Sequence, residues 1–242
     1  MKGDDTMLLF YVRHGDPIYS PDSLTEQGQL QAEALVERMK LCAPEKIFAS
    51  SSNRAILTAK PTAEYFGQEI EILDWCNENH AWRQLTVPTD DGRRTWAFAH
   101  KPTIELFASD EIRKLDKEWY THKAFKDTTF IEGITRIEKE TDAFMKDLGF
   151  IHKDNGYFAE SPKYKRVALF AHQGFGLAFL SCLLDVPYPM LSTRFDMGHS
   201  GMTVIEFADE GYSIPKVLQL SNDSHIFRSV NLKTRYQNRV EF

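Results

Sequence analysis

Three short apolar runs, each followed by a helical pattern, constrain the fold of this chain most strongly. Their aromatic and β-branched content is typical of buried strands. These runs are residues 8–12, 46–50 and 166–171. The helical patterns that follow them cover residues 26–41, 54–66 and 175–184. Because a helix that connects two strands usually makes them parallel, the order predicts an α/β fold. We expect a three-layer sandwich with a mostly parallel central sheet and helices on both faces.

Further strands are expected at residues 69–73, 202–207 and 216–220, and a further helix from Thr129 to about Leu148. The stretch from about 79 to 128 lacks this regularity and is too long for an ordinary connection. We therefore predict a single domain over residues 1–242 with an inserted cap at about 79–128, partly helical near 109–120. The tryptophans of this stretch are expected to form a small cap core with Phe98, and its basic residues a solvated surface. These tryptophans are Trp82, Trp96 and Trp119.

Composition excludes several classes of protein. The 242 residues are 42% hydrophobic and 12% aromatic, enough for a sizeable core. The net charge of −6 argues against nucleic acid or an anionic membrane as the main partner. Asp4 and Asp5 do not fit a signal peptide, and no run approaches the about 18 apolar residues of a spanning helix. Cys42, Cys76 and Cys182 are too scattered for a disulfide frame or a zinc site, so we expect a cytoplasmic protein.

Basic side chains stand where the strands end. Arg13 and His14 end the first run, Arg54 opens the helix after the second, and His172 follows the third. The carboxyl ends of parallel strands share one edge of a sheet, so these four side chains can converge. The helix that begins near Arg54 also directs backbone N–H groups to this edge. The sequence therefore predicts an anion site, and phosphate suits it because guanidinium groups bind its oxygens in pairs.

Five motifs, in this order, resemble those of the histidine phosphatase superfamily, which includes the cofactor-dependent phosphoglycerate mutases. They are Arg13-His14-Gly15, Leu24-Thr25 with Gly28 and Gln31-Ala32, Ser50-Ser51 with Arg54-Ala55 and Thr58-Ala59, Ala171-His172, and Asn222-Asp223 with His225. The resemblance covers nearly the whole chain except residues 80–128. It implies that His14 is the nucleophile and forms a phosphohistidine, while Arg13, Arg54 and His172 bind the phosphoryl oxygens.

The leaving alkoxide needs a proton, which a carboxylic acid can supply. Asn77-Glu78 resembles an Asn-Glu pair of the mutases, which favours Glu78 as the acid and leaves Asp74 as the alternative. Gln173 stands where the family usually has glycine, and it either contacts phosphate or adjusts the turn. No metal and no cofactor is expected, because the acidic residues show no ligand spacing.

The resemblance implies a metal-independent phosphomonoester hydrolase whose partner is a small phosphorylated metabolite. Two alternatives remain open. The first is phosphoryl transfer of the phosphoglycerate mutase type, for which Arg93 and Arg94 could bind a second anionic group. The second is a non-catalytic phosphate-binding module.

Overall fold

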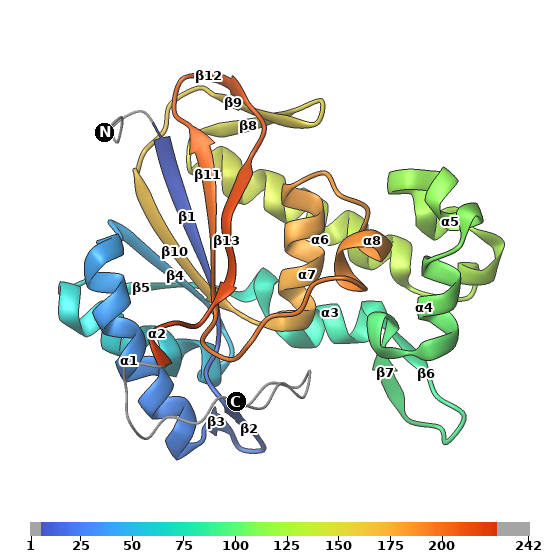
Figure 1. Cartoon of the computed structure of the whole chain (residues 1–242), viewed down its shortest axis with the longest axis horizontal. Coiled ribbons are helices and arrows are strands. Elements are labelled where there is room, and N and C mark those ends of the chain that lie inside the picture. Colours follow the sequence, from blue (N-terminus) through green and yellow to red (C-terminus); the bar gives the residue numbers. More distant parts are fainter. Residues whose placement is uncertain (1–5, 227–242) are drawn as a thin grey trace.

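The computed structural model describes residues 6–226 and has a six-stranded sheet at its centre (Figure 1). The strands, in order across the sheet, are β13 (Lys216–Asn222), β11 (Met202–Ala208), β1 (Thr6–Arg13), β10 (Arg166–Ala171), β4 (Lys46–Ser50) and β5 (Ile70–Leu73). Strands β1, β10, β4 and β5 pair in parallel, whereas β11 is antiparallel to both β1 and β13. The predicted fold class, a mostly parallel sheet in an α/β layer structure, is confirmed.

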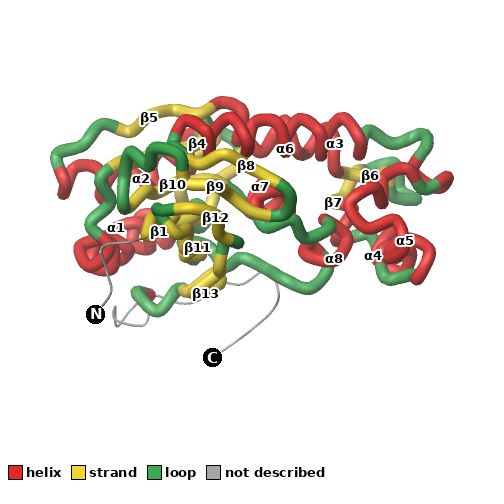
Figure 2. Tube along the Cα trace, turned by 90° about the horizontal axis from the view of Figure 1, so that it is seen from above, coloured by secondary structure: helices red, strands yellow, loops and turns green. Residues whose placement is uncertain are grey.

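Helices cover both faces of this sheet (Figure 2). They are α1 (Glu26–Cys42) and α2 (Asn53–Phe66) on one face, and α6 (Phe130–Asp147) and α7 (Gln173–Leu183) on the other. Strand β1 serves both faces because its side chains alternate. Leu9 and Tyr11 join the core under α6 and α7, while Phe10 and Val12 join the core under α1 and α2. An apolar run without polar interruption is therefore what a strand covered on both sides requires.

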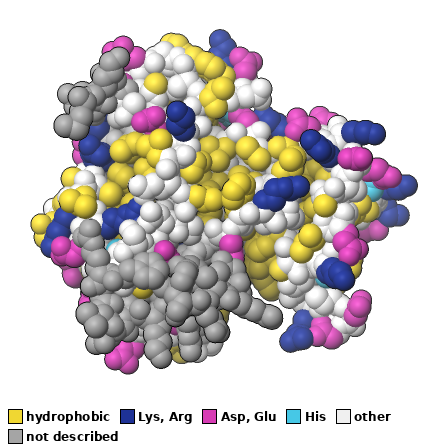
Figure 3. Space-filling model, in the orientation of Figure 1, with side chains coloured by type: hydrophobic (Ala, Val, Ile, Leu, Met, Phe, Trp, Pro, Cys, Tyr) yellow, Lys and Arg dark blue, Asp and Glu magenta, His cyan; other side chains and the backbone are white. Residues whose placement is uncertain are grey.

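The segment after β5 runs from the middle of the molecule to one end of it in both views (Figures 1 and 2). It comprises α3 (Glu78–Leu85), β6 (Thr86–Pro88), β7 (Arg94–Trp96), α4 (Lys101–Phe107) and α5 (Asp110–Leu115). We call residues 79–128 the cap. Acidic and basic side chains are intermixed over this end of the face that Figure 3 shows, so the cap presents no uniformly basic surface there.

The predicted cap core is correct for Trp119, correct in part for Trp96, which is partly buried and stacks on Phe98, and wrong for Trp82. Trp119 is 1% exposed and packs against Phe107 and Phe125 of the cap, and against Phe130 of α6. Trp82 and Trp96 line a cavity. The helix expected near 109–120 is also shorter, because Asp116 has a positive φ of 51° and the chain continues as 3-10 turns.

Several short elements have no clear sequence signal. They are β2 (Pro17–Tyr19), β3 (Asp22–Leu24), β8 (Phe150–Lys153), β9 (Gly156–Ala159), β12 (Gly211–Ser213) and α8 (Tyr188–Ser192). Strands this short carry too few residues to show a period. Among residues 6–226, no helix has the length and apolar character needed to cross a bilayer. Asp4 and Asp5 lie outside the described residues.

Candidate active site

His14 lies directly after β1, at the carboxyl edge of the sheet. Its backbone N–H donates to the carbonyl oxygen of Ala171, which ends the neighbouring strand β10 (2.9 Å). Two glycines let helix α1 approach this turn. A Cβ on Gly15 would lie 2.6 Å from the carbonyl oxygen of Gly28, and one on Gly28 would lie 2.2 Å from that of Asp16. These backbone contacts explain physically why both motifs carry glycine at these positions.

The imidazole of His14 is buried and held in one tautomer. Its Nδ1 lies 2.7 Å from the carbonyl oxygen of Gly15, which can only accept a hydrogen bond. Nδ1 therefore carries the proton and Nε2 keeps a free lone pair. Burial lowers the pKa of His14 well below its usual value, and the neighbouring His172 and Arg13 lower it further. The ring is thus neutral at physiological pH, as a nitrogen nucleophile must be.

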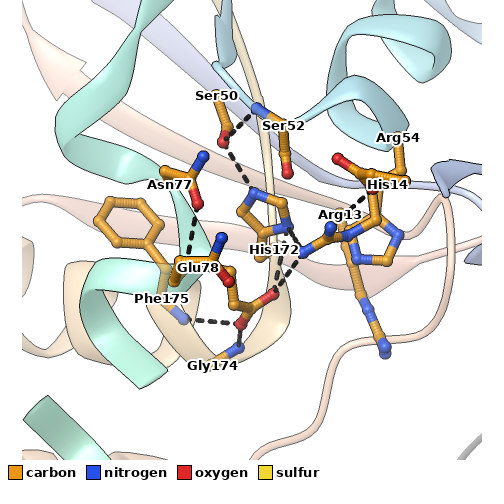
Figure 4. Close-up of polar contacts among 12 residues, drawn as sticks. Arg13, His14, Ser50, Ser52, Arg54, Asn77, Glu78, His172, Gly174 and Phe175 are labelled. Atoms are coloured by element: carbon orange, nitrogen blue, oxygen red, sulfur yellow. Dashed lines mark hydrogen bonds and ion pairs between the residues drawn. The ribbon is translucent and has the colours of Figure 1, made fainter. Parts of the chain in front are cut away.

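Arg54 and His172 meet beside it, as Figure 4 shows. Arg54 is the second residue of α2, and its Nη2 lies 3.2 Å from Nδ1 of His172. Its Nη1 donates to Oδ1 of Asp22 (2.8 Å), which fixes the guanidinium. His172 follows β10, is 0% exposed, and places Nε2 2.8 Å from the hydroxyl of Ser50. The ring centroids of His172 and His14 are 5.2 Å apart.

Glu78 lies at the centre of this cluster (Figure 4). It is the first residue of α3, and Oε1 accepts hydrogen bonds from the backbone N–H groups of Gly174 (2.7 Å) and Phe175 (3.2 Å) in the first turn of α7. Oε2 lies 3.1 Å from Nδ1 of His172 and 3.7 Å from Nη2 of Arg54. Burial raises the pKa of Glu78, but the neighbouring His172 and arginines outweigh it, and the net shift is downward. The free protein therefore holds Glu78 as a carboxylate.

Asp74, the alternative acid, lies outside the cluster. Its side chain is 73% exposed, accepts a hydrogen bond from Ser51 (2.6 Å), and lies 3.0 Å from His80. These hydrogen bonds lower its pKa. Gln173 begins α7, two residues before the expected start of that helix, and donates a hydrogen bond to Asp196. The structure thus brings Glu78, and not Asp74, to Arg13, His14, Arg54 and His172.

Sequence reasoning missed His199, which lies in the loop before β11. Nη2 of Arg13 donates to Nε2 of His199 (2.9 Å), and Nη1 donates to the carbonyl oxygen of Met197. Nδ1 of His199 lies 3.4 Å from Asp16. Burial, together with Arg13, lowers the pKa of His199 to about 3, so the ring is neutral and accepts from the guanidinium. No spacing signal marks His199, because the fold alone brings this loop to β1.

The cluster suits an anion better than a cation. His14, Glu78 and His172 offer ligand atoms within 4.8 Å of one another, which is compact enough for a metal ion. However, the guanidinium of Arg54 lies within 4 Å of both His172 and Glu78 and would repel a cation there. A phosphate group in the same place would meet Arg13, Arg54 and two imidazoles.

A cavity of about 440 Å³ opens from this cluster. Arg13, Arg54, Glu78 and Gly174 line its inner end. The remaining lining residues are Tyr19, Asp22, Asn79, Trp82, Trp96 and Gln173. The cap therefore supplies much of the outer wall.

Comparisons with known proteins agree with this geometry. A family model described as the histidine phosphatase superfamily (branch 1) matches residues 9–105. No curated protein sequence matches the chain. Among solved structures, a mycobacterial glucosyl-3-phosphoglycerate phosphatase is similar with 18% identity and a TM-score of 0.57, over 90% of this chain and 99% of that one.

A phosphoserine phosphatase from Entamoeba histolytica, a mutant in complex with phosphoserine, is similar with 18% identity and a TM-score of 0.58, over 91% of this chain and 99% of that one. The structural likeness thus extends well beyond the family-model match. Residues 9–105 carry the sequence signature of the histidine phosphatase superfamily, and the chain has the histidine phosphatase fold.

Proposed function

We propose that this chain is a phosphomonoester hydrolase that acts on a small phosphorylated metabolite through a phosphohistidine on His14, without a metal ion. One observation carries the proposal. The unprotonated Nε2 of a buried, neutral His14 belongs to the same cluster as Arg13, Arg54 and His172. A neutral nucleophile beside fixed positive charge is what attack on a phosphate dianion requires.

Substrate binding begins with an exchange of anions. In the free protein, the carboxylate of Glu78 contacts Arg54 and His172, the groups that would bind the phosphoryl oxygens. An arriving phosphate takes over these contacts, while Glu78 keeps its hydrogen bonds from the α7 N-terminus. Losing the contact with the guanidinium of Arg54 and gaining an anionic neighbour both raise the pKa of Glu78. Substrate binding therefore favours the protonated acid that the next step needs.

The reaction then has two halves. Nε2 of His14 attacks phosphorus and forms the N–P bond, while the ester P–O bond breaks and the leaving oxygen takes the proton of Glu78. In the second half, Glu78 removes a proton from water, whose oxygen attacks phosphorus and releases His14 and inorganic phosphate. Arg13 and Arg54 stabilise the charge on the equatorial oxygens in both steps.

The structural relatives support hydrolysis. The similar proteins include phosphatases named for glucosyl-3-phosphoglycerate and phosphoserine, both small phosphorylated metabolites. The three cysteines are free, which fits a reducing compartment, and we place the protein in the cytoplasm.

The test measures phosphate release from p-nitrophenyl phosphate in excess chelator between pH 5 and 8. We expect release by the wild type and a loss of about 10³-fold or more in His14→Ala. His100→Ala is the matched control, since His100 bonds Thr103 in the cap. Equal activity of wild type and His14→Ala would remove His14 from the mechanism, and loss of activity with chelator would remove metal independence. Turnover of phosphoglycerate only as isomerisation with a bisphosphate primer would favour the mutase reaction.

A further inference from the structure

The outer wall of the active-site cavity is aromatic on its cap side. Trp82 comes from α3 and Trp96 ends β7, and their rings meet edge to face with centroids 5.1 Å apart. Trp96 also stacks on Phe98, with ring centroids 5.6 Å apart at 13°. Trp82 keeps 37% of its surface exposed. Tyr19 adds a third aromatic ring to the lining.

The charges of the same cavity leave no cation for a second anionic group. Among the described residues, the cations that line it are Arg13 and Arg54, which belong to the proposed phosphate site. Farther out, the charged lining residue is Asp22, whose carboxylate lies 2.8 Å from Arg54. A carboxylate or second phosphate on the substrate would meet Asp22 without a positive partner, which is costly in a partly buried site.

The basic residues of the cap do not compensate. Arg94 donates to the side chain and carbonyl of Thr86 (2.8 and 2.7 Å), and Arg93 pairs with Asp91. Both arginines, with Lys101, line a separate surface cavity. The two arginines are therefore already bound to other groups, and the cavity that they line is not the active-site cavity.

A polyhydroxylated alcohol would find the hydroxyl of Tyr19 and two amides as uncharged partners on this wall, whose carboxylate, that of Asp22, already pairs with Arg54. The two amides are those of Asn79 and Gln173, and Gln173 already donates to Asp196. Aromatic side chains instead bind flat rings through stacking and edge-to-face contacts. The cavity volume of about 440 Å³ accommodates a ring together with the phosphate.

We infer that the substrate is a monophosphate ester whose alcohol carries no charge and bears an aromatic ring, which packs against Trp82 and Trp96. This inference rests on the proposed function, because the same cavity must bind the phosphate. The wall then selects the alcohol, and the arginines bind its phosphate.

Three alkyl phosphates test the inference: the second differs from the first by a carboxylate, and the third carries a ring in place of both free hydroxyl groups. Glycerol 1-phosphate is the small neutral reference, 3-phosphoglycerate adds a carboxylate, and 2-phenylethyl phosphate adds a ring. We expect kcat/KM for 2-phenylethyl phosphate to exceed that for glycerol 1-phosphate by about tenfold or more. We expect 3-phosphoglycerate to fall below glycerol 1-phosphate by about tenfold. The ratio of kcat/KM for 2-phenylethyl phosphate to that for glycerol 1-phosphate should drop about tenfold in Trp82→Ala. It should stay unchanged in Phe158→Ala, because Phe158 is also an exposed aromatic residue (45%, against 37% for Trp82) but lies on β9.

Binding of the three phosphates to the His14→Ala variant separates this inference from the proposed hydrolysis. Tryptophan fluorescence measures this binding. Tighter binding of 3-phosphoglycerate than of 2-phenylethyl phosphate would overturn the inference, as would a ring preference that survives Trp82→Ala. The expected binding order without any turnover by the wild type would uphold the inference and refute the hydrolase. Turnover by the wild type together with the reverse binding order would support the hydrolase and refute the inference.

Discussion

Substitution of Gly174 by alanine tests how closely the cap wall and the acid are fitted together. A Cβ at this position would lie 2.3 Å from Cζ2 of Trp96 and 2.7 Å from Oε1 of Glu78. Carbon atoms in good contact are about 3.5–4.0 Å apart, so the indole must retreat by about 1 Å or more. Glu78 must move as well, although the Gly174 N–H holds it at 2.7 Å. A displacement of about 1 Å in an active site can reduce the rate about 100-fold, or about 2.7 kcal/mol in the barrier.

The assay compares two leaving groups. The leaving group of glycerol phosphate is a strongly basic alkoxide that depends on the acid, whereas the p-nitrophenolate of p-nitrophenyl phosphate leaves with little protonation. We therefore expect Gly174→Ala to lower kcat about 100-fold for glycerol phosphate and only about tenfold for p-nitrophenyl phosphate. Adding Trp96→Ala should recover part of the loss, because it removes the closer clash.

Gly156→Ala is the matched control. It creates a comparable clash, 2.7 Å from the hydroxyl of Tyr212, on strand β9 and not at the active site. It should lower the melting temperature without changing the ratio between the two substrates. A Gly174→Ala enzyme that keeps kcat for glycerol phosphate within threefold of the wild type would refute the proposed position of the acid.

Three other perturbations test separate parts of the site and the fold. Because burial holds the pKa of His14 well below its usual value, deprotonation of His14 should not make the rate rise with pH; kcat/KM should fall above about pH 6, as the phosphate loses the proton that the acid takes up, and a steady rise to pH 8 would contradict this. His199→Ala should weaken inhibition by inorganic phosphate about tenfold, and His199→Gln, which keeps an acceptor for the guanidinium, should weaken it less; an unchanged inhibition constant in the alanine variant would argue against a positioning role. His152 lies between Asp142 and Asp185 (2.8 and 2.9 Å), which raise its pKa to about 9, so its stabilising effect is complete below about pH 6.5 and lost as the pH rises through 9. His152→Gln should therefore lower the melting temperature by about 5 °C at pH 6 and by much less at pH 10, and equal losses at both would refute the charge pairing.

The sheet and the gathering of basic side chains at its carboxyl edge were predictable because they depend on local signals. An unbroken apolar run indicates a strand covered on both faces, and β1 meets that condition through the alternation of Phe10 and Tyr11. Parallel strands in register then bring Arg13 and His172 to the same edge. Glycine is needed at positions 15 and 28 because the backbones of these two segments approach each other closely there.

The rest of the site depends on packing between distant segments. His199 contacts Arg13 although the two residues are 186 positions apart in the sequence, and no pattern in either segment predicts this contact. The choice between Asp74 and Glu78 depended on which of the two carboxylates points to the cluster. Asn77 caps α3, and this cap places Glu78 at the start of the helix, with its side chain toward the cluster. Trp82 looked like a core residue because aromatic content indicates burial but not which cavity a ring lines.

Glu78 and Trp82 are four residues apart on α3 and therefore lie on the same side of that helix. The proposed proton donor and part of the wall that we infer selects the alcohol thus belong to one helix. A sequence change that reshapes the wall by tilting α3 will also shift the carboxyl group and alter the rate. Substrate range and turnover in this chain should therefore evolve together, unless the wall changes through side chains alone, as it can at Trp82.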